Sequence, residues 1–127
     1  MRFRHALKPI APALTVLAAL GALTALSASA APGRGNAADG KKVYLTKCVA
    51  CHKPDGSGGI KLTGNPTPSW RDARRMRDPR YNDDYLRDCI VNGKLKSGMV
   101  AWGKTGQLKP VEIENLIAYI HTFAPRK

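Results

Sequence analysis

The pattern of hydrophobic and polar positions divides the chain into an uncharged N-terminal stretch and a longer polar part. Residues Ile10 to Leu26 carry no charge and are rich in Ala and Leu. Further along, apolar residues recur at helical spacing only in short segments, and no alternating apolar run of useful length is present. This pattern predicts an all-α protein built from short helices.

Start and stop signals mark three of these helices. The first can be capped by Asn36 or Asp39 and is predicted to run to the first thiol of the chain. The second opens at 82–84, where Asn82 or Asp83 can cap it, and ends at Asn92-Gly93. Its predicted apolar face consists of Tyr85, Leu86, Cys89 and Ile90.

The last helix is predicted from Pro110 to about Phe123, with Pro125 beyond its end. Glu112 lies in its first turn, where the helix dipole favours an acid. One apolar stripe identifies its buried face: Ile113, Leu116, Ile117 and Ile120. In the first helix, Gly40 shares a face with Tyr44, which indicates either close approach of another helix or a turn before a late helix start.

The N-terminal stretch has the organisation of a cleavable secretory signal over residues 1–30. Arg2, Arg4 and Lys8 precede the uncharged segment, and Ala28-Ser29-Ala30 supplies an A-x-A cleavage site. Residues 31–38 are then a flexible lead-in, and 39–127 form a single domain. Export predicts a periplasmic protein; the alternative is an uncleaved membrane anchor with the domain facing the periplasm.

Within the domain, Cys48-Val49-Ala50-Cys51-His52 reads C-x-x-C-H, the attachment signature of c-type haem. Two thiols separated by two residues can reach two vinyl groups of one ring. The next residue, His52, then lies under the iron as an axial ligand. The motif therefore predicts one covalently bound haem c, with its iron, and a second ligand elsewhere in the chain.

Two other interpretations of the cysteine pair are weaker. A thioredoxin-like redox pair needs a βαβ pattern around it, and the flanking sequence shows no strands. A zinc site needs two more ligands at similar spacing, and the remaining Cys and His residues are Cys89, His5 and His121. Cys89 is predicted to be a small buried hydrophobe, since its helical register points inward; an intermolecular disulfide is the alternative.

Met99 is the predicted second iron ligand. It lies in a Gly-containing segment with apolar neighbours and Trp102, whereas Met76 lies among arginines and Met1 begins the signal. A thioether favours reduced iron and fills the sixth coordination position, which suits electron transfer. The alternative for Met99 is a core residue without ligation. His121 lies off the apolar stripe of the last helix and is predicted to face solvent.

Charge restricts the choice of partner. Without Arg2, Arg4 and Lys8, 18 of the 21 basic residues remain against 9 acidic ones, a formal net charge of +9. Such a field steers acidic partners toward the protein, and export together with a haem motif argues against nucleic acid. The segment from Arg71 to Arg80 contains five arginines, and it is either a solvated segment with local Asp pairing or a docking patch. Association with a membrane surface is compatible with the same charge.

Taken together, these residues resemble the class I c-type cytochromes over most of the chain from Asp39 to Phe123. The resemblance rests on Gly40 to Tyr44 followed by the C-x-x-C-H motif, on Met99-Val100-Ala101-Trp102, and on the last helix. It implies a cytochrome c fold of three to five short helices wrapped around one covalent haem. It also implies that Gly40 and Tyr44 pack against Leu116 and Tyr119.

The resemblance implies a function and a cofactor-binding set: Cys48, Cys51, His52 and Met99, of which His52 and Met99 are the metal ligands. We expect a monomeric one-electron carrier rather than an enzyme. Its partners are acidic oxidases, reductases or dehydrogenases, and the alternative is a subunit bound permanently to such a complex. Val100 stands where the family commonly has Pro after the ligand, and Pro66 or Pro68 is expected to hold the His52 ring through its carbonyl group.

Overall fold

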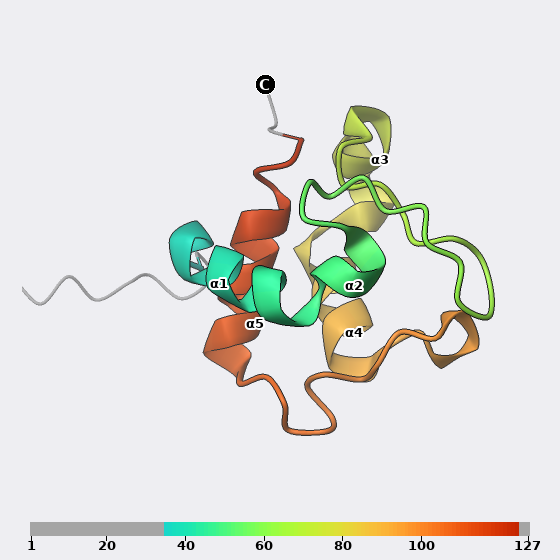
Figure 1. The fold of residues 1–127 in the computed structure, drawn as a ribbon. Coiled ribbons are helices and arrows are strands. Elements are labelled where there is room, and N and C mark those ends of the chain that lie inside the picture. The colour runs from blue at the N-terminus through green and yellow to red at the C-terminus, as the bar shows by residue number, and fades with distance from the viewer. Residues whose placement is uncertain (1–34, 125–127) are drawn as a thin grey trace, which may run out of the picture.

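The structure is a computed structural model that describes residues 35–124, and these residues form five α-helices and two short 3-10 helices. The α-helices are α1 (Ala37–Lys47), α2 (Val49–His52), α3 (Ala73–Arg77), α4 (Asp83–Asn92) and α5 (Pro110–Ile120); the 3-10 helices are η1 (Pro79–Tyr81) and η2 (Leu95–Ser97) (Figure 1). Over these residues the structure contains no β-strand, and one isolated bridge joins Lys94 to Met99. The predicted all-α class is confirmed.

Helix α1 begins earlier than the predicted domain boundary at residue 39. The Asn36 side chain accepts hydrogen bonds from the backbone N–H groups of Ala38 and Asp39, at 2.9 and 3.4 Å. Asn36 is therefore the N-cap, and Ala37 and Ala38 are helical rather than part of a flexible lead-in. Alanine is a strong helix former, so two alanines that follow an N-cap extend the helix instead of forming a flexible segment. The predicted signal peptide, residues 1–30, lies outside the described residues.

Helices α1 and α5 cross in close contact, as Figure 1 shows. A Cβ atom on Gly40 would lie only 1.9 Å from the Asn115 carbonyl oxygen, so the backbones touch where a side chain is missing. One turn further on, the Tyr44 ring packs edge-on against Tyr119 with ring centroids 5.3 Å apart. The interpretation of Gly40 as a helix-packing residue is confirmed.

Helix α4 has the predicted bounds. Asn82 caps it by accepting from the Tyr85 N–H at 2.9 Å, and Gly93 ends it with a φ of 70°. Three residues of the predicted face are buried, while Tyr85 remains 38% exposed: the buried residues are Leu86, Cys89 and Ile90. Beside this face, Arg87 forms a two-point ion pair with Glu114 of α5, at 2.6 and 2.9 Å.

Helix α5 starts at Pro110, as predicted, and the Glu112 carboxylate accepts from the Lys109 N–H at 2.7 Å. All four residues of the predicted stripe are buried. The helix ends at Ile120 rather than Phe123, because the N–H groups of Thr122 and Phe123 bond to carbonyls three residues back and tighten the chain into a turn.

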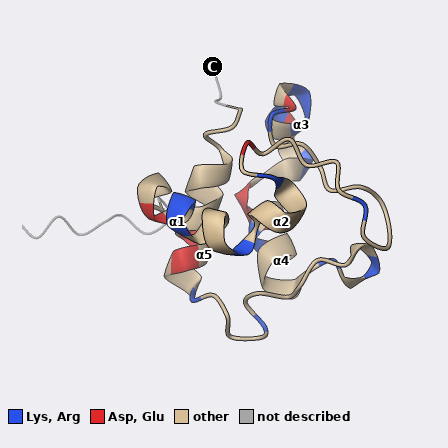
Figure 2. Cartoon of the chain, in the orientation of Figure 1, with Lys and Arg blue, Asp and Glu red and all other residues tan. Residues whose placement is uncertain are grey.

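The arginine-rich segment folds into α3 and η1. Asp72 caps α3, and Asp78 pairs with Arg80 at 2.6 Å, so local Asp pairing is present. Met76 is buried, whereas the neighbouring Arg74 and Arg77 are exposed. Lys and Arg residues are distributed over helices and loops (Figure 2). Among the described residues, no helix has the length and apolar character needed to cross a membrane.

Candidate haem-binding site

The C-x-x-C-H motif forms one wall of a cavity of about 410 Å³. Cys48 ends α1 and precedes α2, so the two thiols and His52 lie on a tight helical turn directly after the α1–α5 crossing. Cys48, Cys51 and His52 all line the cavity. Both thiols are free in this structure.

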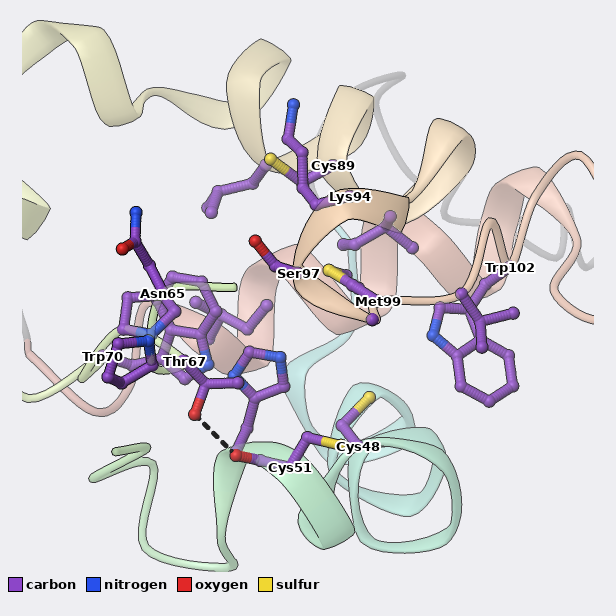
Figure 3. Close-up of a pocket in the computed structure, with 18 of the residues that line it drawn as sticks. Cys48, Cys51, Asn65, Thr67, Trp70, Cys89, Lys94, Ser97, Met99 and Trp102 are labelled. Atoms are coloured by element: carbon purple, nitrogen blue, oxygen red, sulfur yellow. Dashed lines mark hydrogen bonds between the residues drawn. The ribbon is translucent and has the colours of Figure 1, made fainter. Parts of the chain in front are cut away.

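Hydrogen bonds from two distant residues fix this turn. The buried Tyr44 hydroxyl donates to the carbonyl oxygens of His52 and Lys53, at 3.2 and 2.8 Å. The Thr67 hydroxyl donates to the carbonyl oxygen of Cys51 at 2.7 Å, the bond dashed in Figure 3. The α1–α5 crossing and the loop that follows α2 therefore both hold the motif in place.

The His52 imidazole is 8% exposed and stacks on the Trp70 indole, with ring centroids 5.2 Å apart and planes inclined by 25°. Its Nδ1 atom is buried and finds no hydrogen-bond partner among residues 35–124. Pro66 and Pro68 both line the cavity, but neither carbonyl bonds the ring in this structure. The expected Pro–His bond is thus not formed, and Trp70 supports the ring instead.

Burial controls the protonation of the motif. It lowers the pKa of His52 below its ordinary value, so the imidazole is neutral near pH 7 and keeps a lone pair for a metal. Burial, and to a smaller extent the nearby Cys51, raises the pKa of Cys48 to about 12. The free Cys48 thiol is therefore protonated and weakly nucleophilic in the folded chain.

Met99 lies on a different wall of the same cavity. In Figure 3, Met99 and Cys89 are in the upper part of the pocket, and Cys48 and Cys51 are in the lower part. Met99 is partly buried and packs against the core together with Trp102. The structure thus brings Met99 to the pocket that His52 lines, although the two residues are far apart in sequence.

The other residues considered as ligands lie elsewhere. Met76 is buried in the core and does not line the cavity. His121 does not line it either, and its Nε2 atom lies 2.6 Å from an Asp83 carboxylate oxygen. The His121 side chain is 23% exposed, so it faces solvent only in part.

Sequence reasoning missed several residues of the pocket. Trp70 lines it with a buried indole Nε1–H that has no partner among the described residues. Arg75, with its guanidinium over the Tyr81 ring at 4.7 Å, lines it as well. Cys89, predicted as buried, proves to face this cavity. Trp70 and Arg75 are visible in the sequence downstream of the motif. Their positions relative to the pocket could not be predicted, because an irregular loop without periodicity leads up to them.

The residues present fit a haem. Two thiols two residues apart and a neutral imidazole share one wall, and a thioether enters from another. Much of the remaining lining is apolar, and the partnerless Trp70 indole N–H offers a hydrogen bond to a polar group of a bound ligand. In residues 35–124, no group of three or more His, Cys, Asp or Glu side chains is arranged to hold a metal ion by itself.

An all-α fold with a C-x-x-C-H turn on the wall of such a pocket is that of a class I c-type cytochrome. Residues 35–120 match the family described as "Cytochrome C oxidase, cbb3-type, subunit III", and the chain belongs to this family of cytochrome c domains. Its cofactor is haem c with its iron, the group that its cytochrome c relatives bind.

Curated relatives and a solved structure agree with this assignment. The chain is 26% identical to cytochrome c of Nigella damascena and 28% to that of Sesamum indicum, in each case over 68% of this chain and 88% of the relative. It is 29% identical to cytochrome c of Gibberella zeae over 92% of that protein. The solved structure of the KustC0563 c-type cytochrome matches with a TM-score of 0.53 at 26% identity, over 68% of this chain and 98% of the other.

Proposed function

We propose that this protein carries single electrons by means of one haem c, attached through Cys48 and Cys51 and ligated by His52 and Met99. One observation supports the ligand pair above all: His52 and Met99 line one pocket from separate segments of the fold. When bound, the haem supplies a centre that cycles between ferric and ferrous iron. The protein then acts as a carrier and not as an enzyme.

Each residue has a separate part in this proposal. The two thiols hold the ring as thioethers, and the neutral His52 imidazole, packed on Trp70, gives one fixed ligand. The Met99 thioether gives a soft ligand that favours reduced iron and closes the sixth position against small molecules. Apolar lining from Leu86 and Ile90 keeps water away from the centre.

The test is Met99→Leu, with Met76→Leu as a matched control, since Met76 is a buried Met outside the pocket. We expect the oxidised wild type and the control to show the red-edge absorption band of a Met–iron bond. Met99→Leu should lose the band. Its reduction potential should fall by on the order of 0.1 V, within the roughly 0.8 V range that axial ligands span. A wild type without the band, or a Met99→Leu protein that keeps it, would refute the ligand assignment.

The proposed partners are acidic redox proteins, an oxidase, reductase or dehydrogenase, met in the periplasm by a monomeric, processed chain. The excess of basic over acidic residues supports this partner chemistry. Electron exchange should then be transient and should slow steeply as salt is raised, because salt screens the attraction between exposed charges.

A second candidate is an electron-transfer subunit bound permanently to a larger complex. The description of the matching family, a cbb3-type oxidase subunit, favours it. Purification from whole native cells at moderate salt, keeping both the periplasmic and the membrane fractions, separates the two. Recovery of the chain in stoichiometric association with a larger redox protein supports the subunit, and recovery as a free monomer supports the shuttle.

A further inference from the structure

The loop that carries Met99 closes on itself, and one side of it touches α4: a Cβ atom on Gly93 would lie 2.7 Å from the Met99 carbonyl oxygen. The Lys94 N–H donates to the Met99 carbonyl oxygen at 3.1 Å, and the Met99 N–H donates to the Lys94 carbonyl oxygen at 3.2 Å. This pair of bonds closes a small ring around η2. Within residues 35–124, η2 lies against no other helix. The position of η2, on the other side of the loop, therefore depends on contacts with irregular parts of the chain.

Leu62, Thr63 and Gly64 supply such contacts from the loop that follows the C-x-x-C-H motif. The Thr63 hydroxyl donates to the Lys96 carbonyl oxygen at 3.0 Å. A Cβ atom on Gly64 would lie 2.8 Å from the same oxygen, so the two backbones touch there. A Cβ atom on Gly98, the residue before Met99, would lie 3.0 Å from the Leu62 side chain.

The same loop is also attached to the motif. Thr67 donates to the Cys51 carbonyl oxygen at 2.7 Å, and the Gly58 N–H donates to the His52 carbonyl oxygen at 3.2 Å. Residues 58–67 thus connect the turn that carries His52 to the loop that carries Met99. A connection at both ends fixes the separation between the two walls that hold the predicted ligands.

We propose that Thr63 is a positioning residue for Met99, and that its hydrogen bond to Lys96 holds the Met99 loop at the distance at which the thioether reaches the iron. The inference rests on the proposed His52/Met99 ligation. It assigns the two sides of the Met99 loop to different supports: α4 holds the Met99 side, and Thr63 holds the η2 side.

The consequence is a population shift. Wild-type protein divides between a state with Met99 bound and a minor state with the sixth position open. Without the Thr63 bond the open state gains population, and an added ligand that binds only that state binds more tightly in proportion. The bond is exposed to solvent, so we expect a gain of about three- to tenfold, the size of one neutral hydrogen bond.

The experiment measures imidazole affinity of the oxidised holoprotein by absorption in Thr63→Val, which keeps the side-chain shape and removes the hydroxyl. Thr122→Val is the matched control, because the Thr122 hydroxyl also donates to a backbone carbonyl, that of Tyr119 at 2.7 Å, at the end of α5. Thr63→Val should bind imidazole about three- to tenfold more tightly than wild type. Thr122→Val should match wild type, and Thr63→Ser should restore wild-type affinity.

Gly64→Ala provides an independent variant, since its Cβ would press on the Lys96 carbonyl and push the loops apart. We expect tighter imidazole binding and a lower reduction potential, with the Met–iron band weakened but present. If wild type shows the band and both Thr63→Val and Gly64→Ala bind imidazole as wild type does, the positioning role is refuted while the ligation stands. If wild type lacks the band and Met99→Leu leaves imidazole affinity unchanged, the ligation itself fails, and the positioning role with it.

Discussion

Gly40 is the residue at which α1 and α5 come closest. A Cβ atom there would lie 1.9 Å from the Asn115 carbonyl oxygen and 2.4 Å from its carbon, both of them backbone atoms that cannot rotate away. The contact also aligns Tyr44, whose hydroxyl holds the carbonyl groups at the end of the haem motif. One missing methyl group therefore links helix packing to the geometry of the site.

We predict that Gly40→Ala destabilises the holoprotein by about 1–3 kcal/mol, the usual range for overpacking a close contact. Denaturant unfolding followed by far-UV circular dichroism measures it. Lys41→Ala is the control, because Lys41 is the next residue on α1 and is exposed; it should stay within about 0.5 kcal/mol of wild type. Equal stabilities for the two variants would contradict the close contact.

Among the elements, α4 and α5 are joined by a partly buried ion pair between Arg87 and Glu114. Both guanidinium bonds to this carboxylate are short, at 2.6 and 2.9 Å, and the Glu114 side chain is 28% exposed. Hydrogen bonding to Glu114, more than any other interaction, raises the pKa of Arg87 above its ordinary value. A two-point pair fixes the relative position of two helices better than a single contact does.

We expect Glu114→Gln to destabilise the protein by about 1 kcal/mol, since the amide keeps one acceptor and loses the charge. A thermal unfolding curve gives the effect, and it should shrink as salt is raised, because salt weakens only the charged pair. Asp39→Asn is a suitable control, since Asp39 forms a single exposed ion pair with Lys42 at 2.8 Å. A larger effect for Asp39→Asn than for Glu114→Gln would refute the prediction.

At the level of elements, the sequence predicts regular segments well and irregular ones poorly. The stripe of α5 and the bounds of α4 follow from periodicity and caps, which are local signals. The early start of α1 depends on Asn36, one of the two caps considered. The support of His52 by Trp70 and the contact of Thr63 with Lys96 could not be predicted, because loops without periodicity bring these residues together over long separations.

In the candidate site, the motif predicts the wall that carries both thiols and His52, since those five residues are contiguous. Met99 required a choice among three methionines; the structure places Met99, and not Met76, on the pocket wall, and its role as a ligand stays a prediction. The expected carbonyl partner of His52 is not formed in the structure. Contacts of this kind depend on loop geometry within a fraction of an ångström, which residue types alone do not determine.

For the whole molecule, the pocket is lined by residues from most elements of the fold and is partly open to solvent, since its lining includes the exposed Leu62 and Val100. Residues from α1, α2, α4, α5 and the two long loops all line it. A cavity of about 410 Å³ left unfilled would cost at most on the order of 10 kcal/mol, at about 24 cal/mol per Å³. That is comparable with the entire stability of about 5–15 kcal/mol expected of a small domain.

The haem-free chain should therefore lose most of its cooperative structure. We predict that Cys48→Ala/Cys51→Ala, which cannot attach haem c, shows less than about half of the holoprotein's helical circular dichroism and no sharp thermal transition. Cys89→Ala is the control: it alters a pocket thiol outside the motif and should retain haem and helix. A cooperative transition in the haem-free double variant would show that α1 and α5 suffice to hold the fold.

The contact between α1 and α5 also determines how late in folding the pocket can close. The Asn36 N–H donates to the Asn115 side chain across a separation of 79 residues, so α1 cannot reach its main packing partner, α5, until nearly the whole domain has been synthesised. Closing so long a loop is slow compared with forming either helix. During that interval Cys48 and Cys51 lie in an open chain, not in the closed pocket that keeps the Cys48 thiol protonated. If haem is attached as proposed, we expect attachment to be fastest before the last helix arrives.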